Sequence, residues 1–281
     1  MSETCALVWP VSSVMSQTGT DRKFANTLER GLRILEAFTI HDVGLTHAQI
    51  SERTGLPKPT VSRLTYTLSK LEYLSQNGRN GRFFPGPAAL VLGTVATFSV
   101  PFLEIVAGDM QRLADKTGTL TAVSVRYREL MVLLCAWHPA TGQTVGAQSG
   151  HRIPLLGSSS GQAVLGALDD ARFERLKPGT ALRAIRKNGY AQLMRDGFTI
   201  VPREMRYPGR VNAVGVPYFA PALGQPVGFS CGGPTGSLTD QRLREEVAPA
   251  LRATVHSLEQ RTDQASAISI RAQITREGGA P

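Results

Sequence analysis

The chain has 281 residues, a formal net charge of +9 at pH 7, 42% hydrophobic residues and 19% charged residues. This length allows two domains that each bury a core, and this composition is typical of a globular protein. The basic excess favours a polyanionic partner such as nucleic acid, although a soluble basic enzyme could carry a similar charge.

Residues 1–22 are expected to form a flexible leader, because they lack the basic start of a signal peptide. The sequence contains no run of 18 or more apolar residues that would predict a membrane span. Its three cysteines, Cys5, Cys135 and Cys231, are odd in number and have no metal-ligand spacing, which favours the reduced cytoplasm. The histidines are scattered and no phosphate-binding glycine motif occurs, so neither a metal site nor a cofactor is expected.

The first regular pattern is an amphipathic helix in residues 21–40. Leu28, Leu32, Leu35 and Phe38 recur at helical spacing, with charged residues between them. This helix would brace two shorter helices that follow it in the chain.

Those two helices are predicted between residues 46 and 71, joined by a tight turn. Thr46 opens the first helix and Gly55 ends it, while Pro57 stands near the start of the second. An apolar stripe then recurs at positions i, i+3, i+7 and i+10, formed by Val61, Leu64, Leu68 and Leu71. This pattern is typical of a helix-turn-helix, whose second helix enters the major groove of DNA.

A β-hairpin is predicted directly after the second helix. Residues 73–74 and 82–84 flank a turn at residues 77–81, which is rich in residues that tolerate a positive φ. Helix, turn, helix and hairpin form a winged helix-turn-helix, which we place at residues 23–85. Its candidate DNA contacts lie on the second helix and the hairpin, and they are Lys58, Pro59, Thr60, Ser62, Arg63, Thr67, Arg79 and Arg82.

Leu28–Phe38 and Gly55–Leu64 resemble the DNA-binding module of IclR-type bacterial transcription regulators. The spacing matches that family over residues 24–262. The resemblance implies a winged helix-turn-helix, a linker helix and a GAF-like domain that binds a small effector.

The linker helix is expected at residues 86–117, with a kink or break at Pro101. Four of its side chains are too apolar for an exposed linker, and they are Leu90, Leu92, Val95 and Phe98. Two interpretations remain open, because these residues could contact a second copy of the chain or pack against the chain's own domains.

Residues 118–262 predict the effector-binding domain. Strands are expected at 121–127, 130–137, 143–148, 198–201, 211–219 and 227–231, and helices at 161–169, 180–195 and 240–260. An antiparallel sheet with helices on its faces belongs to the α+β class, and the resemblance implies the GAF-like version. Residues 263–281 are polar and are expected to form a flexible tail.

A cluster of small residues precedes the helix that begins near residue 161. Ser158, Ser159, Ser160 and Gly161 would offer hydroxyls and backbone N–H groups to a carboxylate at a helix N-terminus. The resemblance implies that this loop contacts the effector, with Ser159 and Ser160 at the contact positions. Alternatively, a serine here simply caps the helix and binds nothing else.

The resemblance adds five residues to the expected effector site. Arg203 and Glu204 fall in a segment that is acidic in the family, and Asn212 continues the match. Arg203 could bind a carboxylate with two hydrogen bonds or remain solvated. Ser230 and Gly232 match a strand end that commonly carries two serines, so Gly232 removes one hydrogen bond and leaves the identity of the effector open.

Residues 157–161 also satisfy G-x-S-x-G, the nucleophile motif of α/β-hydrolases. A hydrolase would use Ser159 and would need a later acid and histidine, but the only later histidine is His256, midway along a predicted amphipathic helix. The alternation of parallel strands and helices expected of that fold is also missing. A serine hydrolase is therefore the weaker alternative, and a DNA-binding protein whose second domain only oligomerises is another.

Together these features predict a cytoplasmic, non-enzymatic transcription regulator, either a repressor or an activator, of a catabolic operon. Its expected partners are double-stranded operator DNA, a small organic acid with an aliphatic or aromatic carboxylate, and further copies of the chain in a dimer or a dimer of dimers. Ligand binding would then alter the spacing of two DNA-binding heads that lie about one helical turn of DNA apart.

Overall fold

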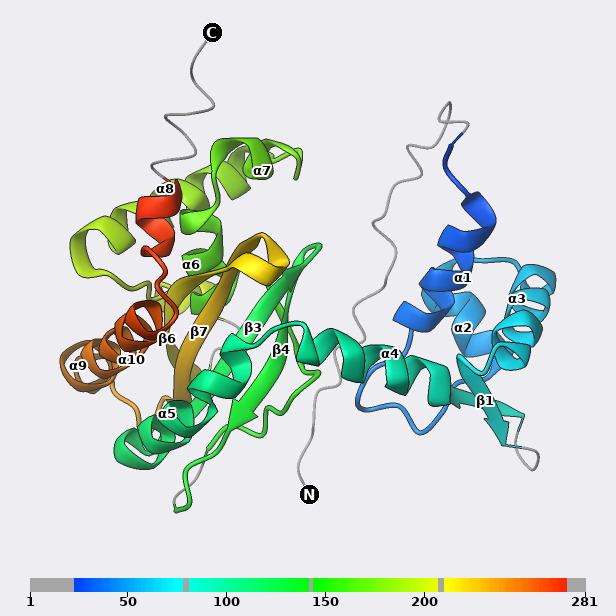
Figure 1. Ribbon diagram of the computed structural model, residues 1–281, viewed down its shortest axis with the longest axis horizontal. Helices are drawn as coiled ribbons and strands as arrows, with labels where there is room; N and C mark the ends of the chain where they lie inside the picture. Colours follow the sequence, from blue (N-terminus) through cyan, green and yellow to red (C-terminus); the bar gives the residue numbers. More distant parts are fainter. Residues whose placement is uncertain (1–22, 78–80, 142–143, 207–209, 272–281) are drawn as a thin grey trace, which may run out of the picture. The chain divides into compact units, whose positions relative to one another are not determined.

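The computed structural model describes residues 23–77, 81–141, 144–206 and 210–271. The described residues divide into two compact units, the first ending at Ser99 and the second beginning at Val100 (Figure 1). Each unit has its own buried apolar core.

The first unit is a helix-turn-helix followed by a hairpin and a further helix. Its elements are α1 (Asn26–Glu36), α2 (His47–Thr54), α3 (Lys58–Lys70), β1 (Leu74–Asn77), β2 (Arg82–Pro85) and α4 (Pro87–Phe98). Thr46 starts α2 with a capping box that includes Gln49, and Gly55 ends it at a φ of 68°. The two strands pair antiparallel, from Leu74 with Pro85 to Asn77 with Arg82. The predicted winged helix-turn-helix is therefore confirmed.

The predicted linker is broken near Pro101, one of the two outcomes expected there, and so consists of two helices. α4 ends at Phe98, and α5 (Phe102–Thr117) begins after Pro101. The apolar side of α5 is buried in the core of the second unit, where Val106 and Met110 are fully buried. α5 is thus a core helix of the second unit, whereas every residue of α4 retains some exposure.

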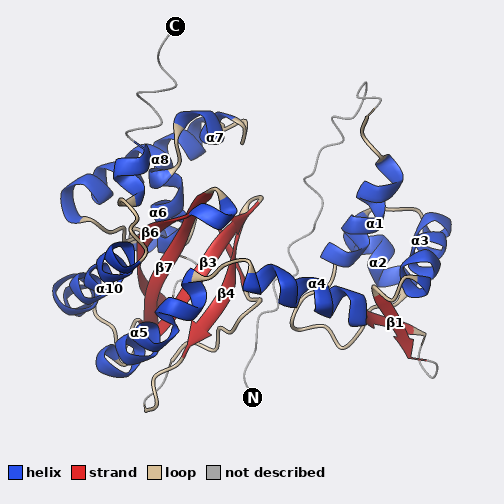
Figure 2. Ribbon diagram, in the orientation of Figure 1, coloured by secondary structure: helices blue, strands red, loops and turns tan. Residues whose placement is uncertain are grey.

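The second unit is built on one antiparallel sheet of five strands in the order β5-β4-β3-β7-β6. Figure 2 shows β4, β3, β7 and β6 side by side in red. The strands are β3 (Leu120–Tyr127), β4 (Leu130–Trp137), β5 (Arg152–Pro154), β6 (Val211–Ala220) and β7 (Gln225–Pro234). The third predicted strand, at residues 143–148, is wrong in position: among the described residues, the strand that pairs with the free side of β4, opposite β3, is Arg152–Pro154. The predicted strand at 198–201 is reduced to a single bridge between Thr199 and Gly215.

Helices cover both faces of this sheet, as expected for an α+β domain. On one face α5 and α10 (Ala248–Arg261) pack against Val214 and Phe229. α9 (Asp240–Arg242) and a π-helical turn (Leu243–Val247) lead directly into α10. On the other face lie α6 (Ser159–Ala167), α7 (Asp170–Glu174) and α8 (Thr180–Asp196). Short 3₁₀ turns occupy Arg203–Met205 and Pro221–Leu223.

Part of the segment expected to be a flexible tail is packed against the second unit. Residues 267–271 form a helical turn, and Ala267 is buried beside Ala167 and Leu193. Arg271 donates a hydrogen bond to the backbone oxygen of Gly166 at 2.5 Å and lies over the ring of Tyr190. These contacts hold the end of the described chain on α6 and α8.

Candidate functional site

The outward face of α3 collects the residues that the sequence assigns to DNA. Val61 and Leu64 are buried in the core of the first unit, so the opposite face of the helix is left to solvent. Lys58, Pro59, Ser62, Arg63 and Thr67 are all exposed on α3, and Thr60 is half-buried. The helix therefore presents cations and hydroxyls together, the groups that bind phosphates and base edges.

Of the two contacts predicted on the wing, the structure describes Arg82. Arg82 is half-buried, and its guanidinium donates to the backbone oxygen of Gly44 at 2.8 Å and to the side chain of Gln49 at 3.2 Å. It therefore ties the hairpin to α2. Arg79, the other predicted contact, lies outside the described residues.

Two exposed residues of α3 were missed by the sequence reasoning. Tyr66 is 65% exposed, and the ammonium of Lys70 lies 5.6 Å from the centre of its ring. Tyr66 is three residues from Arg63 and Lys70 is four residues from Tyr66, so the three share one outward face. The signal was available in the sequence, because both positions fall opposite the apolar stripe.

In the first unit, an ion pair connects α2 to the end of α1 and to the loop between these two helices. Arg53 donates two hydrogen bonds of 2.7 Å to the carboxylate of Asp42 and a third, of 2.9 Å, to the backbone oxygen of Ala37. Burial opposes ionisation of Asp42, but the bonds from Arg53 and Thr39 outweigh it and lower the pKa of this carboxyl below its ordinary value. The pair therefore remains charged at neutral pH.

In the second unit, the predicted serine cluster lies where α6 meets the sheet. Ser158 caps α6 by accepting a hydrogen bond of 3.2 Å from the backbone N–H of Gly161. The hydroxyl of Ser159 donates to the backbone oxygen of Ala213 at 2.7 Å and accepts from the N–H of Val201 at 3.3 Å. Two of the three serine hydroxyls thus already position the loop.

Glycines in the strands allow α6 to approach the sheet this closely. A Cβ atom on Gly215 would lie 2.5 Å from the backbone of Ser159, and one on Gly228 would lie 2.7 Å from the Cβ of Ser160. The hydroxyl oxygen of Ser124 lies 3.2 Å from that same position on Gly228. Ser160 and Ser124 therefore lie close to each other between α6 and the sheet.

The predicted serine of β7 faces the same side of the sheet. Side chains alternate along a strand, and Phe229 and Cys231 both point into the core beneath α5 and α10. Ser230 and Gly232 consequently face α6, and Ser230 pairs across the sheet with Gly215. Ser159, Ser160 and Ser230 are thus brought to one face.

The other three predicted effector residues do not join this cluster. Asn212 is fully buried on the opposite face, where its amide donates to Leu238 at 2.7 Å and to Asp240 at 3.0 Å. Arg203 is largely exposed and pairs with Asp240 at 3.1 Å. Glu204 is exposed in the same 3₁₀ turn.

Arg206, which the sequence reasoning missed, connects Asn212 and Asp240 on that opposite face. Its guanidinium donates to the backbone oxygen of Val201 at 2.7 Å, to Asp240 at 3.0 Å and to the side chain of Asn212. Burial opposes ionisation of Asp240, yet the bond from Arg206 lowers the pKa of this carboxyl. No sequence pattern singles out Arg206 among the arginines of this loop.

The geometry removes the basis for a serine hydrolase. The proton of the Ser159 hydroxyl is directed to a backbone carbonyl, as described above. His256 lies on α10, which packs on the other face of the sheet, and its ring is 3.5 Å from Glu259. Ser159 and His256 are therefore separated by the sheet and cannot act as nucleophile and base.

Other chemistries find little support in the described part of the chain. Burial raises the pKa of the Cys231 thiol to about 12, so this group stays protonated. No group of three or more potential metal ligands occurs among the described residues. No single described helix is long and apolar enough to span a membrane, and α4 with α5 meets that test only as a broken pair.

Comparison with known proteins matches both units. Residues 27–78 match the IclR helix-turn-helix domain, and residues 95–260 match the bacterial transcriptional regulator IclR C-terminal domain. The HTH-type transcriptional regulator TsaQ1/TsaQ2 of Comamonas testosteroni is 27% identical over 257 residues, covering 87% of this chain and 90% of that protein. The Pca regulon regulatory protein of Pseudomonas putida is 30% identical over 62% of this chain and 60% of its own length.

Solved structures agree with these matches. An IclR family transcriptional regulator from Brucella abortus has a TM-score of 0.72 and 31% identity, covering 86% of this chain and 94% of that one. An IclR homolog from Microbacterium hydrocarbonoxydans, complexed with 4-hydroxybenzoate, shares the fold at a TM-score of 0.60 and 20% identity, with 82% and 99% of the two chains covered.

Proposed function

The chain belongs to the IclR family of transcriptional regulators, and we propose that it controls a catabolic operon by binding operator DNA with its first unit and a small organic acid with its second. The observation that carries the DNA-binding part is the outward face of α3, where Lys58, Ser62 and Arg63 lie exposed on the second helix of a helix-turn-helix. Because its target is DNA, we place its action in the bacterial cytoplasm.

A band-shift titration tests the DNA-binding proposal. The probe is the DNA upstream of this gene and of its neighbours, with random-sequence DNA as competitor. We expect a specific complex at moderate salt and a loss of affinity of about tenfold in Arg63→Ala, because a base or phosphate contact is removed. Arg175→Ala, which changes an exposed arginine after α7, is the matched control and should bind normally. The absence of any specific complex would defeat the proposal.

The effector part of the proposal rests on the face that carries Ser159, Ser160 and Ser230. Hydroxyls and backbone N–H groups at the start of α6 suit a carboxylate, and the helix dipole favours a negative charge there. The related fold from Microbacterium binds 4-hydroxybenzoate, an aromatic carboxylate. Since Ser159 already holds the loop, we assign the ligand contacts to Ser160 and Ser230.

Thermal-shift screening tests the effector proposal. The probes are 4-hydroxybenzoate and a panel of aliphatic and aromatic acids. A ligand that binds only the folded state raises the melting temperature, and the rise should be smaller in Ser230→Ala. Ser237→Ala, at an exposed serine just beyond β7, serves as the control. If no acid raises the melting temperature, the second unit serves assembly alone.

The third part of the proposal is that the chain acts as a dimer, or a dimer of dimers. Leu90, Val95 and Phe98 of α4 are 74%, 58% and 79% exposed. An apolar surface of this kind on an otherwise folded unit is typical of a protein contact. A second copy seated on α4 would pair two DNA-binding heads, which must lie about one helical turn apart to reach successive major grooves.

A further inference from the structure

Tyr66 lies on the outward face of α3, the face that we propose binds DNA. Along a helix, residues three and four positions apart lie on the same side, so Tyr66 stands between Arg63 and Lys70. Its neighbour Thr65 is fully buried and Val61 is fully buried, whereas Tyr66 is 65% exposed. The ring is therefore not a core residue of the first unit.

The ring is held by a charged neighbour on its own helix. The ammonium of Lys70, one turn later, lies 5.6 Å from the ring centre, within the range of a cation–π interaction. Lys70 in turn is exposed and has the charge that attracts a phosphate. Tyr66 thus presents an aromatic group between two cations that suit the DNA backbone.

The major groove contains an apolar group that an aromatic ring on α3 could contact. Each base pair presents donors and acceptors there, and the 5-methyl group of thymine is the apolar group that separates A·T from the other pairs. Tyr66 is the only aromatic residue of α3, and the other exposed side chains around it are polar or charged. We propose that Tyr66 determines part of the operator specificity by packing its ring on the methyl group of a thymine. This inference rests on the proposed function of the first unit.

The test combines selection of DNA sequences with removal of a single methyl group. Full-length protein is first used to select its preferred sites from a random DNA pool, so the operator sequence is obtained in the experiment itself. Each thymine of the selected site is then replaced by deoxyuridine, which lacks only the 5-methyl group. Binding to each site is measured for the wild type, Tyr66→Phe, Tyr66→Ala and Tyr66→Gln, with Tyr127→Ala as the control at an exposed tyrosine of the second unit.

We expect one thymine whose replacement weakens the wild type and Tyr66→Phe about tenfold, since a good base contact is worth a few kcal/mol at most. The same replacement should have no effect on Tyr66→Ala or Tyr66→Gln, and both variants should stop selecting thymine at that position. In that case the effects of changing Tyr66 and of removing the methyl group do not add, which shows that the ring and the methyl group interact. Tyr66→Phe keeps the ring and controls for the hydroxyl, while a folding defect in Tyr66→Ala or Tyr66→Gln would weaken binding to every sequence and not only at one thymine.

Three other outcomes overturn the inference. Tyr66→Ala could select the same sites with the same affinity, it could lose affinity equally for all sequences, or it could change the assembly state of the protein. These results would assign Tyr66 no role, a backbone contact or a protein contact respectively. A wild-type protein that selects no sequence at all would instead refute the DNA-binding function itself.

Discussion

At the scale of single residues, the buried ion pair between Arg53 and Asp42 joins α2 to the segment that precedes it in the first unit. Both side chains are largely buried, at 14% and 11% exposed. Removing one partner leaves a buried charge without compensation, so Arg53→Ala should lower the free energy of unfolding by about 3 kcal/mol. Urea unfolding measures this loss, and Arg183→Ala, in an exposed ion pair with Glu174, should change little. Equal losses in the two variants would contradict the prediction.

The same pair predicts an acid limit for the first unit. The folded-state pKa of Asp42 is lowered, so its carboxylate contributes stability above the unfolded-state pKa of about 3.9. That contribution is lost as the pH falls through the lower, folded-state value. Asp42→Asn should therefore be less stable than the wild type at pH 7, and the difference should shrink between pH 5 and pH 3. A difference that is constant over this range would show that Asp42 does not titrate as described.

Residue-level assignments could be predicted where periodicity decides them. The stripe predicted for α3 comprises Val61, Leu64, Leu68 and Leu71. Val61 and Leu64 are buried and Leu68 is half-buried, but Leu71, at the end of the helix, is 59% exposed. Partners of long polar side chains could not be predicted, because they depend on which segments meet in space. Arg82 donates hydrogen bonds to Gly44 and Gln49, and Asn212 donates to Leu238 and Asp240. In both cases no local sequence pattern connects the two segments that meet.

At the scale of elements, the contact between α6 and the sheet depends on glycine. A Cβ atom on Gly215 would lie 2.5 Å from the backbone of Ser159, which cannot move without moving α6. Gly215→Ala should therefore cost about 2 kcal/mol or more of stability and should weaken effector binding with it. Gly146→Ala, where nothing lies within 4 Å of the new Cβ, is the control. Chemical unfolding and thermal shift measure the two effects, and an unchanged Gly215→Ala would show that the packing is looser than described.

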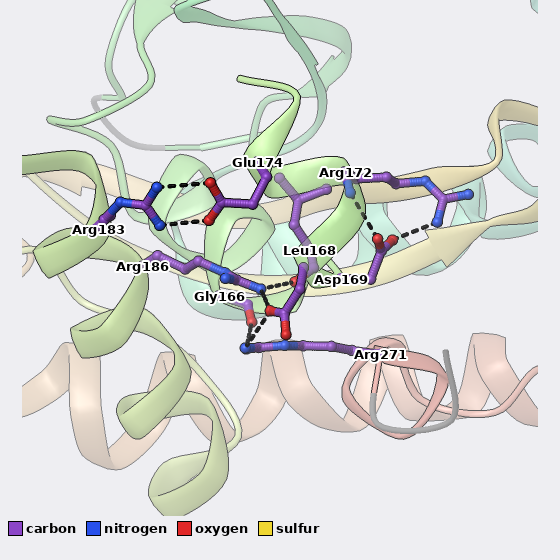
Figure 3. A network of polar contacts seen from close by, with 9 residues as sticks. Gly166, Leu168, Asp169, Arg172, Glu174, Arg183, Arg186 and Arg271 are labelled. Carbon is purple, nitrogen blue, oxygen red and sulfur yellow. Dashed lines mark hydrogen bonds and ion pairs between the residues drawn. The ribbon is translucent and has the colours of Figure 1, made fainter. Parts of the chain in front are cut away.

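A network of arginines and acids surrounds the other end of α6 (Figure 3). Arg186 donates to Asp170 and to the backbone oxygen of Leu168, and Arg172 donates to Asp169. Arg271 reaches the same place from the end of the described chain and donates to Gly166. Burial lowers the pKa of Arg271, but an arginine remains charged at neutral pH. A cation at the C-terminal end of α6 also complements the helix dipole.

This network predicts a stabilising role for Arg271. Replacing Arg271 with alanine removes a charged hydrogen bond and the contact with the ring of Tyr190, where the guanidinium lies 3.9 Å from the ring centre. We expect a loss of about 2 kcal/mol in urea unfolding of the second unit. Lys187→Ala, at an exposed position of α8, should be neutral. If Arg271→Ala is equally neutral, the packed end of the chain contributes nothing to stability.

Elements with a strong repeat were predictable, and elements defined by their neighbours were not. The helix-turn-helix, β3, β4 and the long final helix follow from periodicity in the sequence. β5, the edge strand that pairs with β4, is only three residues long, so its position is set by that pairing rather than by a hydrophobic pattern in the sequence. Residues 267–271 are polar in part, and their packing depends on Ala167 and Leu193 far away in the chain. Local composition alone cannot show such contacts.

At the scale of the whole molecule, the two units have separate cores. The first core includes Ile34, Ile50 and Val61, and the main core of the second includes Met110, Phe229 and Leu251. Multidomain chains of this kind commonly depart from two-state unfolding. Arg53→Ala and Arg271→Ala should therefore shift different transitions in calorimetry, which assigns each transition to its unit.

The apolar face of α4 yields the last prediction, which concerns assembly. Phe98 is 79% exposed, so Phe98→Glu should leave the fold of each unit intact while placing a charge in the proposed contact with a second copy. Light scattering should then detect monomers. Operator affinity should fall by about 100-fold, because the two DNA-binding heads no longer act as one molecule. Val43→Glu, at an apolar residue that is 83% exposed before α2, should change neither property. A Phe98→Glu protein that keeps both its assembly state and its affinity would show that α4 is not the contact, since a buried glutamate at a dimer interface cannot be tolerated without cost.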